Sequence, residues 1–463
     1  MSESEDLQLE VDTMIDFDLL IRKAASMGLS EVEVYLVDSL TTEFKVANDR
    51  IIESTRRKEL DIGIRGAIGK KVGGIRVNTL SESSIELALD RLVSMIKASP
   101  EDPYWSGFPP LMKPFAKQVT PDEKTISMSE EEYVDLLKYT MDRFKEPAVL
   151  KGAKKAVVVE GSFDVHRQDI VIMNSNGVYS QEAYSGVLLW LTLSVEKNGS
   201  LSDKSLAYYR SRISLEEIER KAVEEGERSL LFFDSRPVES GTYEIVLYPS
   251  IAGAILSISL APAFSALNIL ENRSPIKDKY GMTIVSEKVT MIDDPFLETA
   301  TGTRSFDDEG VPTRVKRVVD RGVFKTILQS YYTSRRMNID PTGNGVRQSP
   351  STQPIPGFNN LVLEGRSGSI EEFTRQVDRG IIVFEVIGYW MSDPVTGSVK
   401  ATVTHGLLVE RGEAQRPVKG VVIGGNIYDW LSKDLVEIGK DNEIFGNTAL
   451  PSIWIRDVKV AGK

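Results

Sequence analysis

The sequence predicts an α+β fold in two domains. Strand segments with period-two alternation and amphipathic helices are mixed in residues 1–235, whereas residues 236–463 contain mostly strand segments. The chain has 463 residues, which is enough for more than one hydrophobic core. Hydrophobic residues make up 41% and charged residues 27% of it, as is ordinary for a globular protein. We place the domain boundary near residues 235–240.

The N-terminal domain is expected to contain an antiparallel sheet. Alternating apolar and polar residues predict strands at residues 31–36 and 42–46. The segment Gly69-Lys-Lys-Val-Gly-Gly74 stands between two strand segments, 61–65 and 74–77, and predicts a hairpin. Asn174-Ser-Asn-Gly177 has the turn chemistry of another hairpin. The other strand segments of this domain are residues 156–165, 170–173, 178–182, 187–195 and 206–209.

Helices that flank this sheet are predicted by periodicity and by start signals. Residues 14–27 form an amphipathic segment that ends before Gly28. In a capping box, a serine and a glutamate three residues later satisfy free N–H groups at the start of a helix. Such pairs stand at Ser83 and Glu86, at Ser129 and Glu132, and at Ser214 and Glu217. Residues 99–121 contain several prolines and aromatic residues and predict an ordered connector between two of these helices.

The C-terminal half is predicted to be mostly β. Its strand segments are residues 289–292, 314–319, 323–329, 380–387, 401–409 and 452–460. A capping box at Ser369 and Glu372 predicts one further helix. The uncharged run 245–270 approaches the length of a membrane-spanning helix, but prolines, serines and Asn268 interrupt it. We therefore expect a buried strand and helix there.

Charge and composition limit the partners and the compartment. The net charge of −12 argues against nucleic acid, because phosphate binding depends on Lys and Arg releasing counterions. The first ten residues are acidic and lack the apolar segment of a secretory signal. The chain has no cysteine, which is consistent with a reducing compartment. We expect a cytoplasmic protein that binds neither membrane nor nucleic acid.

Three C-terminal segments carry a resemblance to a known family. They are Phe306-Asp-Asp-Glu-Gly-Val-Pro-Thr313, Asp340-Pro-Thr-Gly-Asn-Gly345 and Leu450-Pro-Ser-Ile-Trp-Ile-Arg-Asp-Val-Lys-Val-Ala-Gly462. In this order and at these separations they resemble the TldD/PmbA family. The resemblance extends over nearly the whole chain and implies that the C-terminal domain is a barrel-like antiparallel β domain. The TldD branch of this family is a zinc metallopeptidase, and the PmbA branch, also called TldE, lacks the zinc ligands.

The positions of the zinc ligands indicate the PmbA branch. In TldD proteins a His-Glu-x-x-x-His segment and a distant C-terminal cysteine supply three ligands and a general base. Matching Gly253 to the family glycine puts Ser257, Ile258 and Pro262 at the His, Glu and His positions. Serine is a poor zinc ligand, isoleucine cannot be a base, and proline has no ligand atom. The chain has no cysteine to supply a thiolate near residues 437–439. The resemblance thus implies no catalytic residue, metal or cofactor in this chain, and zinc in a partner subunit.

The chain has two histidines, and both are expected to be structural. His405 lies in an alternating strand segment, so we expect a strand residue whose polar atoms are satisfied. His166 follows the strand-like run 157–165, and the same interpretation applies. Two histidines this far apart in the sequence are a weak basis for a metal site.

The acidic motif is interpreted as a loop. Asp307, Asp308 and Glu309 concentrate charge, but consecutive residues of an extended chain point to alternate faces. Further ligands at the spacing of a calcium loop are absent. Turn-forming residues complete the two motif loops, namely Gly310, Pro312, Thr313, Pro341, Thr342, Gly343 and Asn344.

Three functions are consistent with these features of the sequence. The resemblance implies first a non-catalytic subunit that pairs with a TldD-like zinc metallopeptidase and admits extended peptides, either unfolded peptides or peptide precursors. The second is a stand-alone peptidase or other hydrolase; no Gly-x-Ser-x-Gly elbow is present and histidine bases are scarce. The third is a regulatory binding module of the gyrase-modulator type, with a homodimer among its forms.

Overall fold

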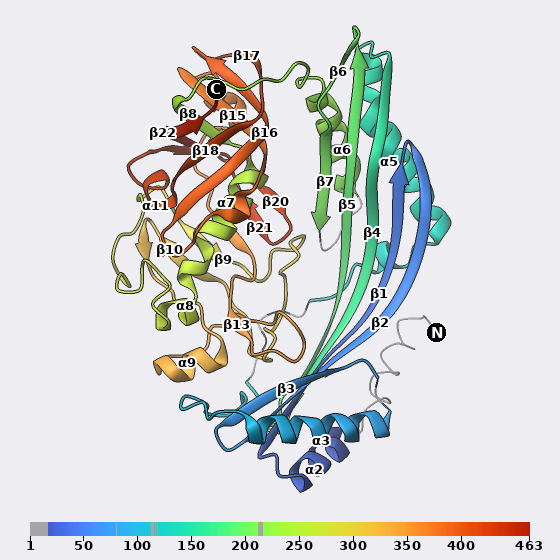
Figure 1. The fold of residues 1–463 in the computed structure, drawn as a ribbon, viewed down its shortest axis with the longest axis vertical. Coiled ribbons are helices and arrows are strands. Elements are labelled where there is room, and N and C mark those ends of the chain that lie inside the picture. The colour runs from blue at the N-terminus through green and yellow to red at the C-terminus, as the bar shows by residue number, and fades with distance from the viewer. Residues whose placement is uncertain (1–16, 80, 113–114, 116, 118, 212–215) are drawn as a thin grey trace.

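The computed structural model describes residues 17–463, apart from residues 80, 113–114, 116, 118 and 212–215. A long, curved sheet from the N-terminal half faces a rounded C-terminal part, and two helices lie below the narrow end of the sheet (Figure 1). The described secondary structure is a mixture of helices and mainly antiparallel strands, so the predicted α+β class is confirmed.

The N-terminal sheet has seven strands in the order β3-β2-β1-β4-β5-β6, with β7 pairing with β5. All of its pairings are antiparallel. Gly177 closes the β4–β5 hairpin with a positive φ and donates to the carbonyl of Asn174, as the turn chemistry predicts. The strands are β1 Glu31–Ala47, β2 Arg50–Ile68, β3 Lys71–Val77, β4 Lys155–Asn174, β5 Tyr179–Lys197, β6 Ser200–Leu201 and β7 Ser205–Ser211.

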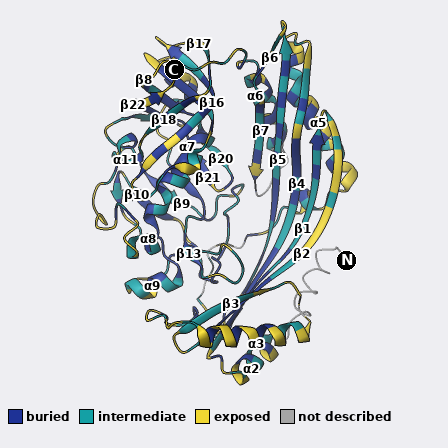
Figure 2. Cartoon of the chain, in the orientation of Figure 1, coloured by how far each residue is buried: buried dark blue, intermediate teal, exposed yellow. Residues whose placement is uncertain are grey.

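Helices cover one face of this sheet and leave the other face to the C-terminal part. On β1, Val32, Val34 and Leu36 pack with α2 Phe17–Ser26 and α3 Glu82–Ala98. Further along the same face, Phe44 and Val46 pack with α5 Glu130–Leu150 and α6 Glu216–Ser229. A short helix, α4 Glu123–Ile126, precedes α5. Because side chains alternate along a strand, the odd-numbered residues of β1, such as Glu33 and Tyr35, point to the opposite face. Figure 2 shows the buried interior of the sheet and the exposed outer turns of α3.

The C-terminal part contains a closed barrel. Its five strands pair in the order β15-β8-β22-β18-β16, and β16 pairs back to β15. The barrel strands are β8 Gly241–Leu247, β15 Arg379–Ile387, β16 Ser398–Glu410, β18 Val421–Asn426 and β22 Ile453–Ala461. β17 Glu413–Val418 pairs with β16, and β19 Leu435–Ile438 pairs with β22. The barrel-like domain implied by the family resemblance is therefore present.

A second sheet lies beside the barrel. It comprises β9 Met291–Asp293, β10 Lys316–Asp320, β11 Val323–Phe324, β14 Leu361–Leu363, β20 Glu443–Phe445 and β21 Thr448–Leu450, and β12 Gly345–Val346 pairs separately with β13 Ile355–Pro356. The helices of this part are α7 Pro249–Ser259, η1 Ala261–Phe264, α8 Ala266–Leu270, α9 Tyr331–Met337, α10 Ile370–Thr374, η2 Tyr389–Met391 and α11 Ile427–Trp430. α7 packs against β21 and β20 and carries buried apolar residues of the main C-terminal core.

Several predicted boundaries are wrong. β1 is a single strand of 17 residues where two short strands were expected, because its polar middle still pairs on both sides. α3 is capped by Ser81 and not by Ser83, since the Ser81 hydroxyl accepts from the Ser84 N–H. The strand expected at residues 323–329 ends at Phe324. The predicted helix start at residue 14 and the Ser214 end of one capping box lie outside the described residues.

Other local predictions are confirmed. The capping box at Ser129 and Glu132 is formed in both directions. Ser369 caps α10 by accepting from the Glu372 N–H. The uncharged run 245–270 is the end of β8 followed by α7, η1 and α8. Within the described part of the chain, no helix has both the length and the apolar character needed to cross a membrane.

Candidate functional site

The two motif loops predicted from the sequence lie against each other. The Asp308 N–H donates to the Gly345 carbonyl over 3.0 Å, and the Gly345 N–H donates to Asp307 Oδ2 over 2.8 Å. Phe306 and Pro312 form a bridge that closes the first loop. The second loop runs from Pro341 into β12, so segments more than 30 residues apart in sequence form one site.

Hydrogen bonds occupy the acidic side chains of the first loop. Asp307 Oδ1 accepts from the N–H groups of Glu309 and Val311 at 2.9 and 3.1 Å. Asp308 accepts from the Tyr35 hydroxyl at 3.1 Å and from Arg304 at 3.0 Å. Backbone N–H groups and fixed side chains therefore hold these carboxylates, which is how carboxylates order a loop.

Two glycines allow close packing here: Gly343 against the first motif loop, and Gly310 against the turn between β4 and β5. Gly310 and Gly343 both have a positive φ, of 77° and 69°. A Cβ on Gly343 would lie 2.5 Å from the Pro312 carbonyl oxygen, and one on Gly310 would lie 2.7 Å from a Val178 methyl group. Only glycine meets both demands without strain. Thr313 completes the first loop by donating its hydroxyl to the Arg304 carbonyl over 2.7 Å.

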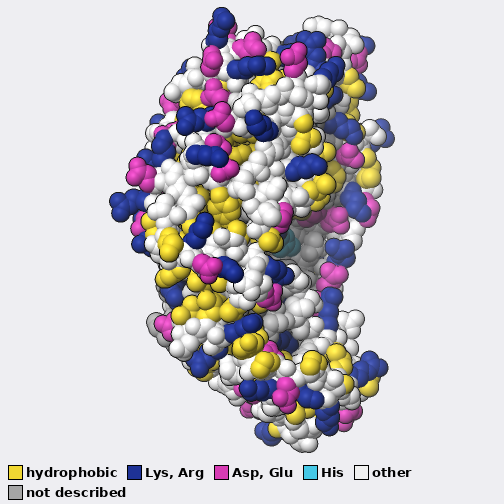
Figure 3. Space-filling model, turned by 60° about the vertical axis from the view of Figure 1, so that its left-hand side comes forward, with side chains coloured by type: hydrophobic (Ala, Val, Ile, Leu, Met, Phe, Trp, Pro, Cys, Tyr) yellow, Lys and Arg dark blue, Asp and Glu magenta, His cyan; other side chains and the backbone are white. Residues whose placement is uncertain are grey.

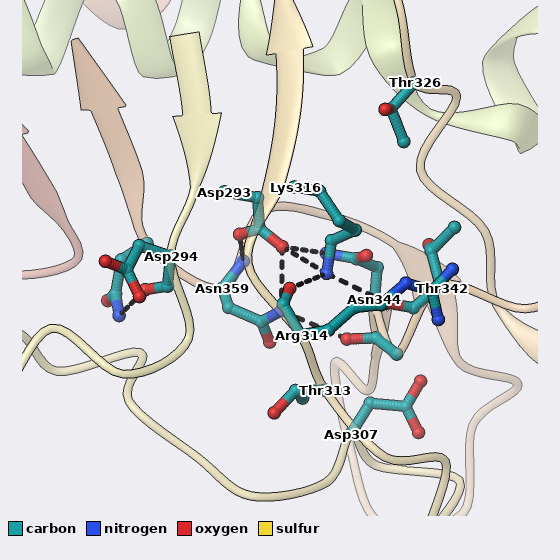
Figure 4. A network of polar contacts seen from close by, with 12 residues as sticks. Asp293, Asp294, Asp307, Thr313, Arg314, Lys316, Thr326, Thr342, Asn344 and Asn359 are labelled. Atoms are coloured by element: carbon teal, nitrogen blue, oxygen red, sulfur yellow. Dashed lines mark hydrogen bonds and ion pairs between the residues drawn. The ribbon is translucent and has the colours of Figure 1, made fainter. Parts of the chain in front are cut away.

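A buried ion pair supports the second loop (Figure 4). Lys316 Nζ lies 2.9 Å from Asp293 Oδ2, with side-chain exposures of 5% and 0%. Lys316 also donates to the Thr342 carbonyl, and Asn344 donates to Asp293 over 2.8 Å. Asn359 donates to the same aspartate from both its backbone and its side chain. The loop is thus built onto β9 and β10 through one buried carboxylate.

Burial perturbs the acids of the first loop. It raises the pKa of Asp307, although three backbone N–H donors oppose this shift. Burial and the charge of Asp307 together raise the pKa of Glu309 to about 8. The two carboxyls both lie close to Gly345, so they disfavour simultaneous ionisation. Such a pair can hold a proton near neutral pH.

Residues of the N-terminal sheet complete this site, and sequence reasoning missed them. Glu33 on β1 is fully buried and pairs with Arg65 over 3.0 Å and with Arg347. Arg347 follows the second loop and donates its backbone N–H to Asp308 over 2.7 Å. The sequence does contain one sign of this contact: a glutamate and a tyrosine, Glu33 and Tyr35, interrupt the otherwise apolar strand segment 32–36.

The three residues that the family resemblance matches to zinc-site positions lie elsewhere. Ser257 and Ile258 are on α7, and Pro262 is in η1. The Ser259 hydroxyl is buried and bonded to the Ile255 carbonyl over 2.7 Å, so the helix itself uses it. No group of three or more His, Cys, Asp or Glu side chains suited to a metal occurs in the described part of the chain. Zinc therefore does not fit the residues present at α7 and η1.

A cleft of about 970 Å³ opens at the start of α7. Its walls come from β7 and α6 of the N-terminal sheet domain and from Tyr248, α7, β15 and β20 of the C-terminal part. Lys221, Glu224 and Arg228 of α6 line one side. Figure 3 shows the surface hollowed between the two parts of the molecule.

His405 lies beside this cleft and is not the satisfied residue that the sequence predicts. It belongs to β16, as expected, and only 7% of its surface is exposed. Its Nδ1 lies 2.6 Å from Glu385 Oε2, but its Nε2 has no hydrogen-bond partner among the described residues. The ring of Phe232 packs against it edge-on at 4.6 Å between centroids. His166 lies within β4 and lines a separate cavity.

Family models match most of the chain. Domain 1 of the PmbA/TldA metallopeptidases matches residues 32–96, the central domain residues 123–230, and the C-terminal domain residues 240–462. The last match includes α7, η1 and both motif loops. The chain belongs to the PmbA/TldD metallopeptidase family.

Individual relatives of this family agree with the match. The crystal structure of TldE from Thermococcus kodakarensis superimposes with a TM-score of 0.87 at 25% identity, covering 96% of this chain and 100% of that one. A metalloprotease of Methanocaldococcus jannaschii is 26% identical over 87% of this chain and 89% of its own length. A metalloprotease PmbA homologue of Buchnera aphidicola is 24% identical over 94% and 93%. The chain is therefore a PmbA/TldE-type member of the PmbA/TldD family.

Proposed function

We propose that this chain is the non-catalytic PmbA/TldE-like subunit of a TldD/TldE-type zinc metallopeptidase complex. The observation that carries the proposal is the composition of α7 and η1. By the family resemblance, Ser257, Ile258 and Pro262 correspond to positions where TldD-type zinc chemistry needs two imidazoles and a carboxylate. A TldD-like partner would supply the zinc, the general base and the attacking water.

The cleft supports a role in admitting extended peptides. Two of its walls are strands at the ends of their sheets: β7 pairs with β5, and β20 pairs with β21, among the described strands. Near its end, β7 already accepts one hydrogen bond, from the Gly446 N–H to the Arg210 carbonyl. Exposed strand edges bind extended peptides through main-chain hydrogen bonds, which do not depend on sequence. We propose that unfolded peptides or peptide precursors reach the partner's zinc along this cleft. The complex would act in the cytoplasm.

The motif loops have a different part in this proposal. Their carboxylates are held by backbone N–H groups, Tyr35 and Arg304, so they are engaged in structure and not aimed at a substrate. We propose that they fix the N-terminal sheet to the C-terminal part, and so set the width of the cleft. The division of the chain near residues 235–240 remains part of this proposal.

Co-purification tests the proposal. Tagged protein from the native host should bring down a TldD-like chain that carries a His-Glu-x-x-x-His motif. The pair should hydrolyse unfolded casein, lose this activity on removal of zinc by a chelator, and regain it when zinc is returned. The same tagged chain made alone should be inactive on the same substrate.

Two outcomes would overturn it. Recovery of this chain as a homodimer or monomer, without a TldD-like protein, would remove the partner from the proposal. Zinc-dependent hydrolysis by the chain alone would show that ligands other than those expected at α7 and η1 form a site.

A further inference from the structure

A small pocket opens beside the peptide cleft. It has a volume of about 280 Å³ and shares Lys221, Arg228, Tyr248, Phe384 and Glu443 with the cleft. At roughly 30 Å³ for each water in the liquid, this volume equals that of about nine waters. The pocket therefore has room for a single large side chain and not for a longer stretch of peptide.

Aromatic rings form much of its wall, so we call it the aromatic pocket. The rings belong to Tyr208, Phe232, Tyr248, Phe384, Tyr389 and Phe445. Tyr208 and Phe445 lie 4.8 Å apart between ring centroids, and Tyr248 and Phe384 lie 5.9 Å apart. Rings at these separations favour a further aromatic group packed edge-to-face or offset among them.

Two of the residues that line the pocket each carry a buried polar atom without a hydrogen-bond partner among the described residues. These atoms are His405 Nε2 and Ser205 Oγ. Because His405 Nδ1 faces a carboxylate oxygen of Glu385 at 2.6 Å, Nδ1 carries the proton in the neutral ring. Nε2 is then an acceptor that needs a donor. A buried polar group without a partner is costly, so a ligand that satisfies it gains affinity.

The charges of the pocket exclude an ionic occupant. Lys221 is already paired with Glu443, and Arg228 is already paired with Glu225. No basic side chain is therefore left over among those that line the pocket to bind a carboxylate. The three carboxylates that line the pocket, on Glu225, Glu385 and Glu443, are paired with Arg228, His405 and Lys221, so none of them is left over to bind a cation. The Arg228 guanidinium, which lies over the rings of Tyr248 and Phe384 at 4.4 and 4.9 Å, would also repel one. The occupant that remains is neutral and aromatic and carries a donor.

We propose that the aromatic pocket is a specificity subsite for a tyrosine side chain of the peptide in the cleft. The phenol hydroxyl donates to His405 Nε2 and accepts from Ser205, since a hydroxyl can do both. The ring packs among the aromatic walls. Glu385 is a positioning residue, because it holds the imidazole in the tautomer that accepts. This inference rests on the proposed peptide role of the cleft.

Peptide binding tests the subsite. Fluorescein-labelled decapeptides of glycine and serine, each with one central Tyr, Phe or Ala, are titrated into the full chain and into its complex. The Tyr peptide should bind about 2- to 10-fold more tightly than the Phe peptide, the range expected for one net hydrogen bond. The Phe peptide should in turn bind more tightly than the Ala peptide, because its ring leaves water.

Variants separate the hydrogen bond from packing. His405→Phe keeps a ring but removes the acceptor, and should abolish the preference for Tyr over Phe while the Phe peptide still binds. His405→Gln restores an acceptor and should recover part of the preference. Glu385→Gln frees the imidazole tautomer and should weaken the preference. His166→Phe changes the other histidine, in a separate cavity, and should leave the preference unchanged.

The outcomes distinguish this inference from the proposed function. Equal affinities for the Tyr and Phe peptides, unchanged by His405→Phe, would overturn the subsite while peptide binding in the cleft stands. Failure of all three peptides to bind the complex would overturn both. Loss of binding to every peptide in His405→Phe, with an unchanged unfolding temperature, would mean that His405 supports the cleft itself and does not select tyrosine.

Discussion

Glu33 of β1 and Arg347 after β12 form a buried ion pair across 314 residues of sequence. Arg65 of β2 pairs with the same glutamate, and all three side chains are no more than 3% exposed. Arg347 also stacks over the Tyr35 ring at 4.8 Å and bonds the Asp308 loop. This network joins the N-terminal sheet to the family motif, so the motif loops and the sheet form one structural unit.

Breaking this network should cost much stability. Arg347→Ala leaves Glu33 buried with a single partner, so the free energy of unfolding should fall by about 3–5 kcal/mol. Urea titration followed by tryptophan fluorescence measures the change. The exposed pair of Lys45 and Glu53 is the control, and Lys45→Ala should cost less than about 1 kcal/mol. Equal decreases in the free energy of unfolding for the two variants would contradict a stabilising role of this buried network.

The Glu309 carboxyl should make stability depend on pH. Its pKa is about 8 in the folded chain, whereas an unfolded glutamate loses its proton near pH 4.3. Between these values the folded state binds more protons, so the free energy of unfolding falls as pH rises from about 5 to about 8. Glu309→Gln replaces the titrating carboxyl by an amide. The decrease of the free energy of unfolding with pH should then become less steep by up to about 1.4 kcal/mol per pH unit. Urea titrations of both proteins across that range measure it; parallel slopes would refute the buried proton.

Gly343 should tolerate alanine much less well than Gly69. Both have a positive φ, but a Cβ on Gly69 would have no atom within 4 Å, whereas one on Gly343 would lie 2.5 Å from the Pro312 carbonyl oxygen. Gly69→Ala should therefore lower the free energy of unfolding by about 1–2 kcal/mol, from backbone strain alone. Gly343→Ala should cost about 1–3 kcal/mol more, because the motif loops must separate. Thermal unfolding of the two variants measures the difference, and similar costs would show that the loops do not need this close approach.

Local signals predicted the helices and hairpins well. The Ser129 capping box, the Asn174–Gly177 turn and the break-up of the run 245–270 all depend on residues near each other in sequence. The length of β1 was underestimated, because pairing with β2 and β4 extends it through polar residues that show no strand periodicity of their own.

Long-range contacts were beyond sequence reasoning. Neither motif loop contains a signal that the two loops contact each other. The pairing of Glu33 with Arg347, 314 residues away, is likewise not visible in the sequence. His405 was placed correctly in a strand, but the sequence does not show that Nδ1 would find Glu385 while Nε2 would be left without a partner. The faces that meet across the cleft do so through contacts between β7 or α6 and β20, such as Tyr208 with Phe445 and Lys221 with Glu443, which no local sequence signal predicts.

We propose that this chain has no zinc site of its own, and metal analysis of the isolated chain tests this most directly. The purified chain is incubated with excess zinc, dialysed, and measured by inductively coupled plasma mass spectrometry beside its complex with a TldD-like partner. We expect zinc at the buffer background in the chain alone and about one equivalent in the complex. Stoichiometric zinc retained by the isolated chain would contradict the claim.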